Sequence, residues 1–504
     1  MPKPNRSSSE SRPFGRRPAL AAALLVLLQT AACGRADRVA SPDESVQGIV
    51  LVMIDTLRAD HVSAYGYYRD TTPTLERLAR EGVLFEKVQA PSPWTIPTIA
   101  SLWTGVYPSR HGAGIIAKPG EVRRFPAENP HFQGFSRAAP TLPGCLRDLG
   151  YRTYAWIANP LLRQDCYLDD FDEVRIEYAN AESVVDWVLD RLETIAEGKF
   201  FLYVHFFDIH QPITPPDEFL TRYLPELSVE FASGAELEQF KEGVSRWSWF
   251  GTPQQIATPE FAAFKPLKIA AYDGAVRYVD HQLGRLVEAL RDEGLFDRTA
   301  IAVTSDHGEE LWDHWELERD CYDGPAIGRI GIDHGHTLFQ ELLHVPLIVC
   351  GPGVGRGSRV GSRLSLLDLG ATLVDLARPV TAAPVPLGDG VSFVEALKDQ
   401  EVASRLTIAE GVAYGYELFS IMDSEGRKYV WAPYSGEKDL MFRVDEDPRE
   451  LSDLTRAEPE MAKELRERLE LFIEQQREHP LPAGETATDM PEELRQLGYP
   501  TRDR

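Results

Sequence analysis

The sequence predicts an α/β fold with a large mixed, mostly parallel sheet flanked by helices, followed by a smaller C-terminal α+β subdomain. The chain has 504 residues, enough for one large domain and a smaller one. Several apolar, β-branched runs end abruptly at charged residues, as buried strands of a parallel sheet do. Three short strand-like runs separated by turns follow residue 400, which is typical of a small antiparallel sheet.

The composition is that of a soluble globular protein with a strongly acidic balance. Hydrophobic residues make up 43% and charged residues 26% of the chain, and the formal net charge is -25. Such a protein does not neutralise phosphates electrostatically, so we expect no nucleic-acid partner.

The first 33 residues read as a signal peptide rather than as part of the fold. Arg16 and Arg17 precede a short apolar stretch, Ala19–Leu28, which small residues and Cys33 follow. This stretch is too short to span a membrane comfortably. The position of Cys33 resembles a bacterial lipoprotein signal, with a plain signal peptide as the alternative. We therefore expect export to the bacterial periplasm or cell envelope, with membrane contact only through an N-terminal lipid.

The rest of the chain divides into four predicted parts. Residues 34–47 form a polar tether, 48–385 a catalytic domain, 386–478 the C-terminal subdomain and 479–504 a polar tail. Four cysteines remain after the signal peptide, and none has CxxC spacing, so a structural zinc is not expected. Disulfides and buried free thiols both stay open for Cys145, Cys166, Cys321 and Cys350.

Two predicted strands end in groups that bind metals. The run Gly48–Ile54 stops at Asp55, and the run that begins at Ile301 breaks into Asp306, His307 and Gly308. In an open α/β sheet the ligand site lies outside the carboxyl ends of the strands. These residues therefore predict a metal site, whereas ordinary polar strand ends are the simpler alternative.

Further titratable groups lie at strand exits. A hydrophobic run from Phe200 is followed by Asp208 and His210. A glycine-flanked loop with His334 and His336 precedes the predicted strand Leu342–Val349. Alone, each histidine would be an ordinary polar or exposed residue, but their common position at strand exits favours a functional role.

The stretch Thr95–Gly105 predicts a helix with a hydroxyl at its N-terminus. Pro97 suits the first turn, Thr95 suits the N-cap, and Gly105 suits the C-terminal stop. A nearby divalent cation would lower the pKa of the Thr95 hydroxyl, which is the arrangement of an activated nucleophile. A plain N-cap threonine is the alternative.

Other elements complete the expected fold. Residues 213–265 are expected to be irregular and to form part of the mouth of the site, with aromatic residues Trp247, Trp249 and Phe250. Helices are expected over Leu75–Glu81, Ile269–Leu290, Leu364–Leu376 and Glu458–Gln475, and strands over Leu406–Gly411, Gly415–Met422 and Lys428–Pro433.

The motifs in their order resemble the sulfatase family of the alkaline-phosphatase superfamily, over roughly residues 48–475. The resemblance implies an alkaline-phosphatase-like fold and an ester hydrolase. It rests on five stretches, Met53–His61, Ala100–Gly112, Ser305–Glu310, Gly335–Phe339 and Val345–Val349.

One departure from the family pattern affects the chemistry. Sulfatases carry a Cys-x-Pro-x-Arg motif whose cysteine becomes formylglycine, but the matching residues here are Thr95–Ile99, with threonine in place of cysteine. A formylglycine mechanism is therefore not expected. The Gly-Lys-Trp-His motif is also replaced, by Ile157–Pro160, which removes two cationic contacts to a sulfate.

The remaining residues resemble the threonine-using relatives, phosphodiesterases and phosphoglycerol or phosphoethanolamine transferases. The resemblance implies that His210, with His334 or His336, holds non-bridging oxygens or protonates the leaving group. It also implies one divalent metal ion, Mn²⁺, Zn²⁺, Mg²⁺ or Ca²⁺, of which the single imidazole favours the first three. Its ligands would be Asp55, Thr95, Asp306 and His307, with Thr95 also attacking phosphorus or sulfur. A second metal through Asp208, His210 and a loop histidine is conceivable.

We therefore expect a sulfatase-like, metal-dependent hydrolase of sulfate or phosphate esters with Thr95 as nucleophile. Its substrate would be a small-molecule, glycan-linked or lipid-linked anionic ester. Two alternatives stay open, a phosphoglycerol- or phosphoethanolamine-type transferase and a non-catalytic anion-binding protein.

Overall fold

An eight-stranded mixed sheet forms the centre of the computed structural model, in the order β12-β2-β11-β8-β1-β7-β5-β6. The five strands from β8 to β6 are parallel to one another, while β11 runs antiparallel to both β8 and β2, and β12 is parallel to β2. This confirms the predicted mixed, mostly parallel sheet. The strands are β1 (Gly48–Ile54), β2 (Val83–Gln89), β5 (Arg152–Ile157), β6 (Glu173–Ile176), β7 (Phe200–Phe206), β8 (Thr299–Thr304), β11 (His344–Cys350) and β12 (Ser358–Ser365).

The structure describes most of the unit Pro42–Arg504. The described residues are 46–115, 120–121, 132–134, 139–163, 168–245, 251–321, 330–379, 383, 385–434, 438–482 and 486–487. The predicted signal peptide, almost all of the tether, Trp247, Trp249, Phe250 and Cys166 lie outside them.

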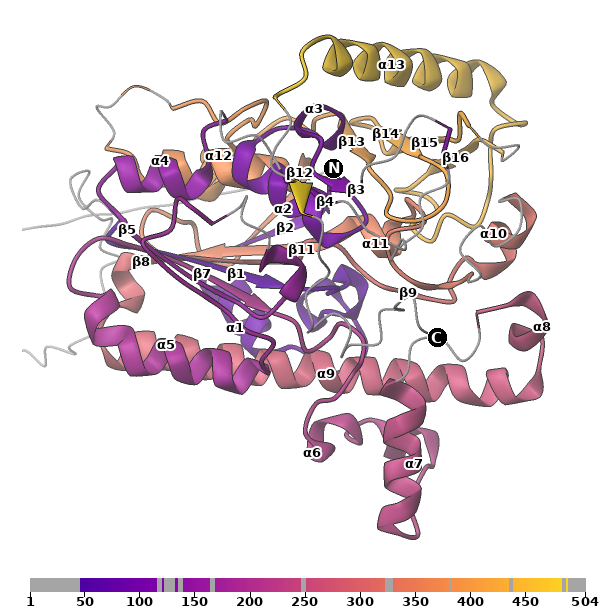
Figure 1. Cartoon of the computed structure of the whole chain (residues 1–504), viewed down its shortest axis with the longest axis horizontal. Coiled ribbons are helices and arrows are strands. Elements are labelled where there is room, and N and C mark those ends of the chain that lie inside the picture. The colour runs from indigo at the N-terminus through magenta and orange to yellow at the C-terminus, as the bar shows by residue number, and fades with distance from the viewer. Residues whose placement is uncertain are drawn as a thin grey trace, which may run out of the picture. The chain divides into compact units, whose positions relative to one another are not determined.

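Helices cover both faces of the sheet (Figure 1). One face is covered by α2 (Thr95–Thr104), α4 (Leu142–Asp148) and α12 (Leu367–Ala377). The other face carries α1 (Pro73–Glu81), α5 (Ala181–Ile195) and α9 (Pro259–Asp292). Neither face of the central strands therefore meets solvent, which is why their sequences are apolar throughout rather than alternating.

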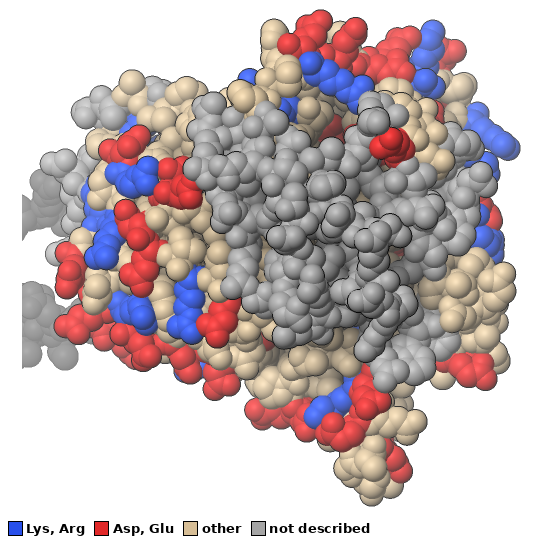
Figure 2. Space-filling view, viewed as in Figure 1, with Lys and Arg blue, Asp and Glu red and all other residues tan. Residues whose placement is uncertain are grey.

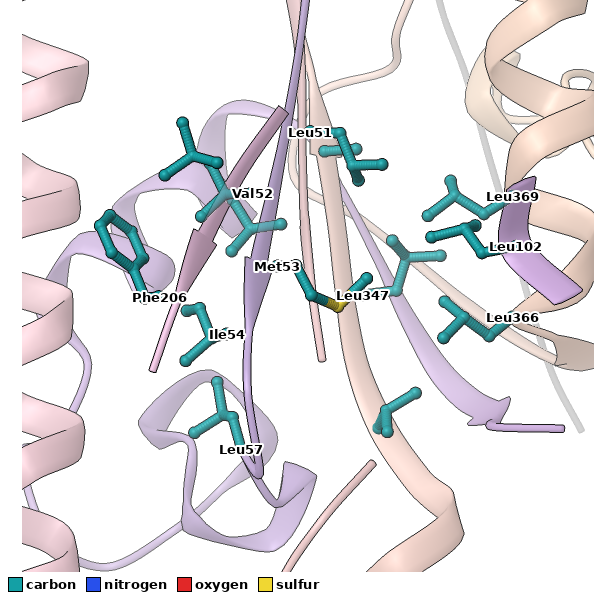
Figure 3. Close-up of a cluster of buried hydrophobic side chains, with 14 of the residues drawn as sticks. Leu51, Val52, Met53, Ile54, Leu57, Leu102, Phe206, Leu347, Leu366 and Leu369 are labelled. Carbon is teal, nitrogen blue, oxygen red and sulfur yellow. The ribbon is translucent and has the colours of Figure 1, made fainter. Parts of the chain in front are cut away.

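The central strand β1 shows this two-sided packing directly (Figure 3). Leu51 and Met53 point toward the side of α2 and α12, where Leu102 and Leu369 lie, whereas Val52 and Ile54 point to the opposite side. All seven residues of β1 are buried. The carboxyl end of β1 is thus held in a fixed position by the core.

A four-stranded antiparallel sheet and a helix form the C-terminal part, as predicted. The strands are β13 (Thr407–Glu410), β14 (Phe419–Met422), β15 (Arg427–Trp431) and β16 (Leu440–Arg443). The helix α13 (Pro459–Glu478) buries Leu465 and Leu469 in one cluster with Phe419 and Tyr429 of this sheet. Their small core is distinct from the core of the main sheet.

The expectation that residues 213–265 are irregular is wrong. The segment contains α6 (Asp217–Leu220), α7 (Gly234–Ser245), α8 (Pro253–Ile256) and the start of α9, which begins ten residues before the predicted Ile269. Helix α7 buries only Val244 fully, and its large apolar residues are just Leu237, Phe240 and Val244, so its apolar pattern is short and weak. Its neighbours α8 and α9 are marked only by their threonine N-caps followed by proline.

The predicted helix Leu364–Leu376 begins later, because Leu364 and Ser365 still belong to β12. Of the cysteines, Cys145 and Cys350 are buried free thiols. The remaining short elements are α3 (Pro108–His111), α10 (Trp315–Cys321), α11 (Gln340–Leu343), β3 (Gly114–Ile115), β4 (Phe132–Gln133), β9 (Glu310–Leu311), β10 (Ile332–Asp333) and β17 (Thr486–Ala487).

On the described part of the face in Figure 2, Asp and Glu lie interspersed with Lys and Arg. None of the described helices is both long and apolar enough for a membrane span.

Candidate active site and metal centre

The candidate site lies where four neighbouring parallel strands end. Strands β8, β1, β7 and β5 are adjacent in the sheet and share one direction, so their carboxyl ends meet at one edge. Asp306 and His307 follow β8, and Asp55 follows β1. Asp208 follows β7, and Asn159 follows β5. Residues far apart in the sequence are thereby brought together at the edge where open α/β sheets bind their ligands.

Asp55, Asp306 and His307 form a buried cluster of metal-binding groups. One ligand atom from each lies within 4.8 Å of the others. His307 Nε2 is 3.7 Å from Asp55 Oδ1 and 3.5 Å from Asp306 Oδ2. All three side chains are fully buried. The predicted ligands of the two strand ends therefore do converge.

The hydrogen bonding of this cluster leaves donor atoms available for a cation. Asp55 Oδ1 and Asp306 Oδ2 are buried without a hydrogen-bond partner in the described structure. The ring of His307 lies with Nδ1 2.9 Å from the Gly308 carbonyl, so Nδ1–H donates there and Nε2 keeps its lone pair. Two orphaned carboxylate oxygens and an imidazole nitrogen with an available lone pair fit a divalent ion.

Thr95 was predicted to be the N-cap of this helix. In the structure Trp94 is the N-cap, and Thr95 is the first residue of α2. The Thr95 hydroxyl nevertheless faces the cluster. Its Oγ1 lies 3.3 Å from His307 Nε2 and 3.5 Å from Asp55 Oδ2. The side chain is buried. All four predicted metal ligands thus stand within contact of one another.

The charges of the cluster interact strongly. For Asp55, burial opposes ionisation, but the His205 hydrogen bond and the neighbouring histidines together lower its pKa below the ordinary value. Burial and the Asp55 carboxylate raise the pKa of Asp306 well above its ordinary value. Burial lowers the pKa of His307 to about 3, so its imidazole is neutral at neutral pH, as a metal ligand must be.

Two residues that the sequence did not assign to the site contact Asp55. Asn159 Nδ2 donates to Asp55 Oδ2 at 2.6 Å and to Thr95 Oγ1 at 3.2 Å. His205 Nε2 lies 3.1 Å from the same Asp55 oxygen. Asn159 follows the apolar end of β5, which is the same signal that marks Asp55 and Asp306, whereas His205 lies inside the apolar run of β7, where nothing in the pattern distinguishes it.

His210 and Asp208 leave β7 in different directions. The ring of His210 stacks on Phe207 at 4.2 Å and lies 4.9 Å from the His334 ring. Burial lowers the pKa of His210 to about 4. Asp208 instead accepts the Ala181 N–H at the start of α5, at 3.0 Å. Asp208 belongs to none of the buried metal-type clusters in the described residues.

The two loop histidines are separated. The His334 ring lies 4.4 Å from the His307 ring, and His334 groups with Glu309 and Asp333. Burial opposes protonation, but Glu309 and Asp333 raise the pKa of His334 to about 9. His336 faces Glu310 and Glu318 in a different cluster. The structure therefore brings His334, and not His336, beside the metal-binding cluster.

Comparison with known proteins gives a consistent result. The sulfatase family model matches residues 47–379. An arylsulfatase of Clostridium perfringens is 24% identical over 470 residues, which span 81% of this chain and 90% of the relative. Among solved structures, a complex with the substrate D-glucosamine-2-N,6-O-disulfate has a TM-score of 0.65 at 17% identity, over 85% of this chain and 98% of the other. The phosphonate monoester hydrolase of Agrobacterium radiobacter has a TM-score of 0.61 at 21% identity, over 88% and 100%.

Proposed function

The chain belongs to the sulfatase family, and from this premise we propose that it is a metal-dependent hydrolase of sulfate, phosphate or phosphonate esters with Thr95 as its nucleophile. The observation that carries the proposal is the position of the Thr95 hydroxyl. It lies 3.3 Å from His307 Nε2 and 3.5 Å from Asp55 Oδ2, in a buried cluster that also holds the orphaned Asp55 Oδ1 and Asp306 Oδ2.

Asp55, Asp306, His307 and Thr95 would hold one divalent ion. When bound, such an ion lowers the pKa of a coordinated hydroxyl and neutralises charge on the transferring group. The neutral imidazole among carboxylate oxygens favours Mn²⁺, Zn²⁺ or Mg²⁺ over Ca²⁺. With threonine at this position, a formylglycine mechanism is not expected.

The protein groups around Thr95 prepare it for attack on sulfur or phosphorus. Its hydroxyl donates to Asp55 Oδ2 at 3.5 Å, so this carboxylate is placed to accept the proton. Asn159 Nδ2, 3.2 Å from Oγ1, donates a hydrogen bond that would stabilise the alkoxide as it forms. The attack would displace the alcohol and leave the sulfuryl or phosphoryl group on Thr95, from which water would release it.

His210 and His334 line the same cluster from the other side. Glu309 and Asp333 raise the pKa of His334 to about 9 against the effect of burial, which favours a protonated imidazole. A cationic imidazole can hold a non-bridging oxygen or give its proton to the leaving alcohol. Between the two predicted loop histidines, we assign this role to His334.

The substrate class follows from this site and from the relatives. A small anionic ester, free or linked to a glycan or lipid, would present one charged group to the buried cluster. We further propose that the protein acts in the periplasm or cell envelope, reached through the N-terminal signal and held there by a lipid on Cys33. The transferase and non-catalytic alternatives gain no support from the relatives described above.

The test is hydrolysis of four p-nitrophenyl esters, the sulfate, the phosphate, the phosphodiester and a phosphonate monoester. The protein is stripped of metal and then reloaded with Mn²⁺, Zn²⁺, Mg²⁺ or Ca²⁺. We expect turnover of at least one ester only after reloading, and loss of that turnover in Asp306→Asn. A protein that binds no metal and turns over none of them would contradict the proposal and favour the anion-binding alternative.

A further inference from the structure

A second cluster of buried metal-type ligands lies outside the catalytic one. It consists of Glu310 on β9, Glu318 on α10 and His336 in the loop after β10, with ligand atoms within 4.8 Å of one another. The three residues are each less than a tenth exposed. They come from three separate segments, and none of them serves the Thr95 chemistry.

The polar contacts of this cluster are incomplete. His336 Nε2 is 3.1 Å from Glu310 Oε2 and 3.6 Å from Glu318 Oε2. The two carboxyl groups interact directly with each other. Glu318 Oε2 accepts the Gly331 N–H at 3.0 Å, but Glu318 Oε1 is buried without a hydrogen-bond partner in the described structure.

The charge balance is also incomplete. Among the described residues, the ion-pair partner of both glutamates is His336, and neither glutamate pairs with Lys or Arg. Two ionised carboxylates facing one imidazole would leave negative charge that is costly in a low dielectric, and burial together with Glu318 accordingly raises the pKa of Glu310 well above its ordinary value. A divalent cation would cancel the charge of the two carboxylates and give Glu318 Oε1 a partner.

We propose that Glu310, Glu318 and His336 bind a second divalent cation, of the Zn²⁺ or Mn²⁺ class, which holds these three segments together. Ligands placed about 2.0–2.2 Å from a tetrahedral Zn²⁺ lie about 3.3–3.6 Å apart. The His336 distances of 3.1 and 3.6 Å are close to this separation. Three side-chain ligands with one nitrogen suit these ions better than Ca²⁺, which takes six to eight oxygens.

The second ion would act on the catalytic site through its position. Glu309 and Glu310 are consecutive residues with different partners, since Glu310 contacts His336 while Glu309 contacts His334. Strands β9 and β10 pair with Asp333 opposite Glu310. The ion would therefore fix the ribbon that carries Glu309 and His334 beside His307, which makes its ligands positioning residues rather than catalytic ones.

The first experiment counts metal ions in the full-length protein after loading with Zn²⁺ or Mn²⁺ and dialysis. We expect two ions per chain in the wild type, one in Glu318→Gln and one in Asp306→Asn. Glu316→Gln, an exposed neighbour on the same helix α10, is the matched control and should keep two. If the catalytic ion alone fails to bind, the wild type would hold one ion, and Asp306→Asn would keep it while Glu318→Gln would lose it.

The second measurement is thermal melting, which stays informative if Glu318→Gln fails to fold. Chelation should lower the Tm of Asp306→Asn, which would retain only the second ion. Where Glu318→Gln folds, chelation should not change the Tm of the Asp306→Asn, Glu318→Gln double variant. An Asp306→Asn protein without bound metal, and with a Tm that a chelator leaves unchanged, would overturn the proposal and show that the two glutamates share a proton instead.

Discussion

Asn159 contacts both Asp55 and Thr95, a role in the site that the sequence did not assign to it. Its amide donates to both Asp55 and Thr95, and it stands where the family's Gly-Lys-Trp-His motif is missing. Asn159→Ala removes two hydrogen bonds to groups that are charged during the reaction. A hydrogen bond to a charged group contributes about 1.5–3 kcal/mol, so we expect kcat to fall about 10- to 100-fold.

Steady-state kinetics and thermal melting check this prediction together. The Tm should fall as well, because Asn159 is fully buried and its loss removes a donor from the buried Asp55 carboxylate, so kcat is compared well below the Tm of both proteins. A kcat equal to that of the wild type would mean that the amide does not assist Thr95. Asn159→Gln, which keeps the amide but lengthens the side chain, tests whether its position matters.

The residues that could be predicted share one property, which is their place at the end of an apolar run. Asp55, Asp306 and His307 were predicted because each follows a buried strand directly, and the structure brings them together. His205 could not be predicted, because it lies inside β7 and its neighbours are apolar. Glu318 was also missed, because its spacing from Glu310 and His336 in the sequence is not that of a known metal-binding motif.

At the scale of single elements, the turn after β8 is the most constrained part of the site. Gly308 follows His307, and a Cβ at this position would lie 1.8 Å from the backbone oxygen of Glu341. Because that neighbour is backbone, it cannot rotate away. Gly308→Ala must therefore shift the turn that carries Asp306 and His307.

We expect Gly308→Ala to destabilise the protein by about 1–3 kcal/mol, as overpacking does, and to weaken metal binding as well. Metal titration followed by thermal melting measures both effects. The matched control is Gly198→Ala, which has no atom near the added Cβ and no left-handed backbone. Unchanged metal affinity in Gly308→Ala would mean that the turn does not hold the ligands in place.

Helices and strands with a clear apolar spacing were predicted well. Those that are marked only by capping residues, or that are largely exposed, were predicted poorly. The central strands and the buried part of α9 were predicted from their apolar residues. The strand β12 was missed because its first residues, Ser358–Gly361, are polar or small and only partly buried. Helix α7 was missed because most of its side chains meet solvent.

At the scale of the whole molecule, a buried ion pair of the C-terminal part hydrogen-bonds to the main domain, through Glu450 to Gln340 and through Lys428 to the Leu338 carbonyl. Lys428 on β15 lies 2.8 Å from Glu450 Oε1, and Glu450 Oε2 accepts the N–H of Gln340 on α11 at 2.7 Å. Both side chains are buried. Lys428→Met leaves a buried carboxylate without its cation, which costs about 3–5 kcal/mol.

Denaturant unfolding of Lys428→Met and of the double variant Lys428→Met, Glu450→Gln checks this prediction. The double variant should recover a large part of the lost stability, because the uncompensated charge is then gone. Equal destabilisation of the single and double variants would show that packing, and not charge, makes the junction stable.

His314 links the same two parts and predicts a pH dependence. Its Nδ1 is 2.5 Å from Glu341 Oε1, and its Nε2 donates to the Arg449 carbonyl at 2.8 Å. Burial opposes protonation, but Glu341 raises the pKa of His314 to about 10. The folded pKa is above the unfolded one, so this contribution to stability is complete below about pH 6.5 and is lost as the pH rises toward 10.

The stability of the wild type should therefore fall more steeply between pH 7 and pH 9 than that of His314→Gln. The difference in slope is at most about 1.4 kcal/mol per pH unit. Free energies of unfolding measured at several pH values for both proteins give the two slopes. Parallel pH profiles would mean that His314 is not protonated in the folded protein.

The central claim is that Thr95 attacks the substrate, and one comparison tests it most directly. The metal-loaded wild type, Thr95→Ala, Thr95→Ser and Thr98→Ala are assayed on the ester that the wild type hydrolyses best. Thr98 is the matched control, because it is a buried threonine on the same helix whose hydroxyl bonds to the Ser92 carbonyl. We predict a loss on the order of a thousandfold or more in Thr95→Ala, measurable turnover in Thr95→Ser and near-normal turnover in Thr98→Ala. Turnover by metal-loaded Thr95→Ala at the wild-type rate would contradict the account.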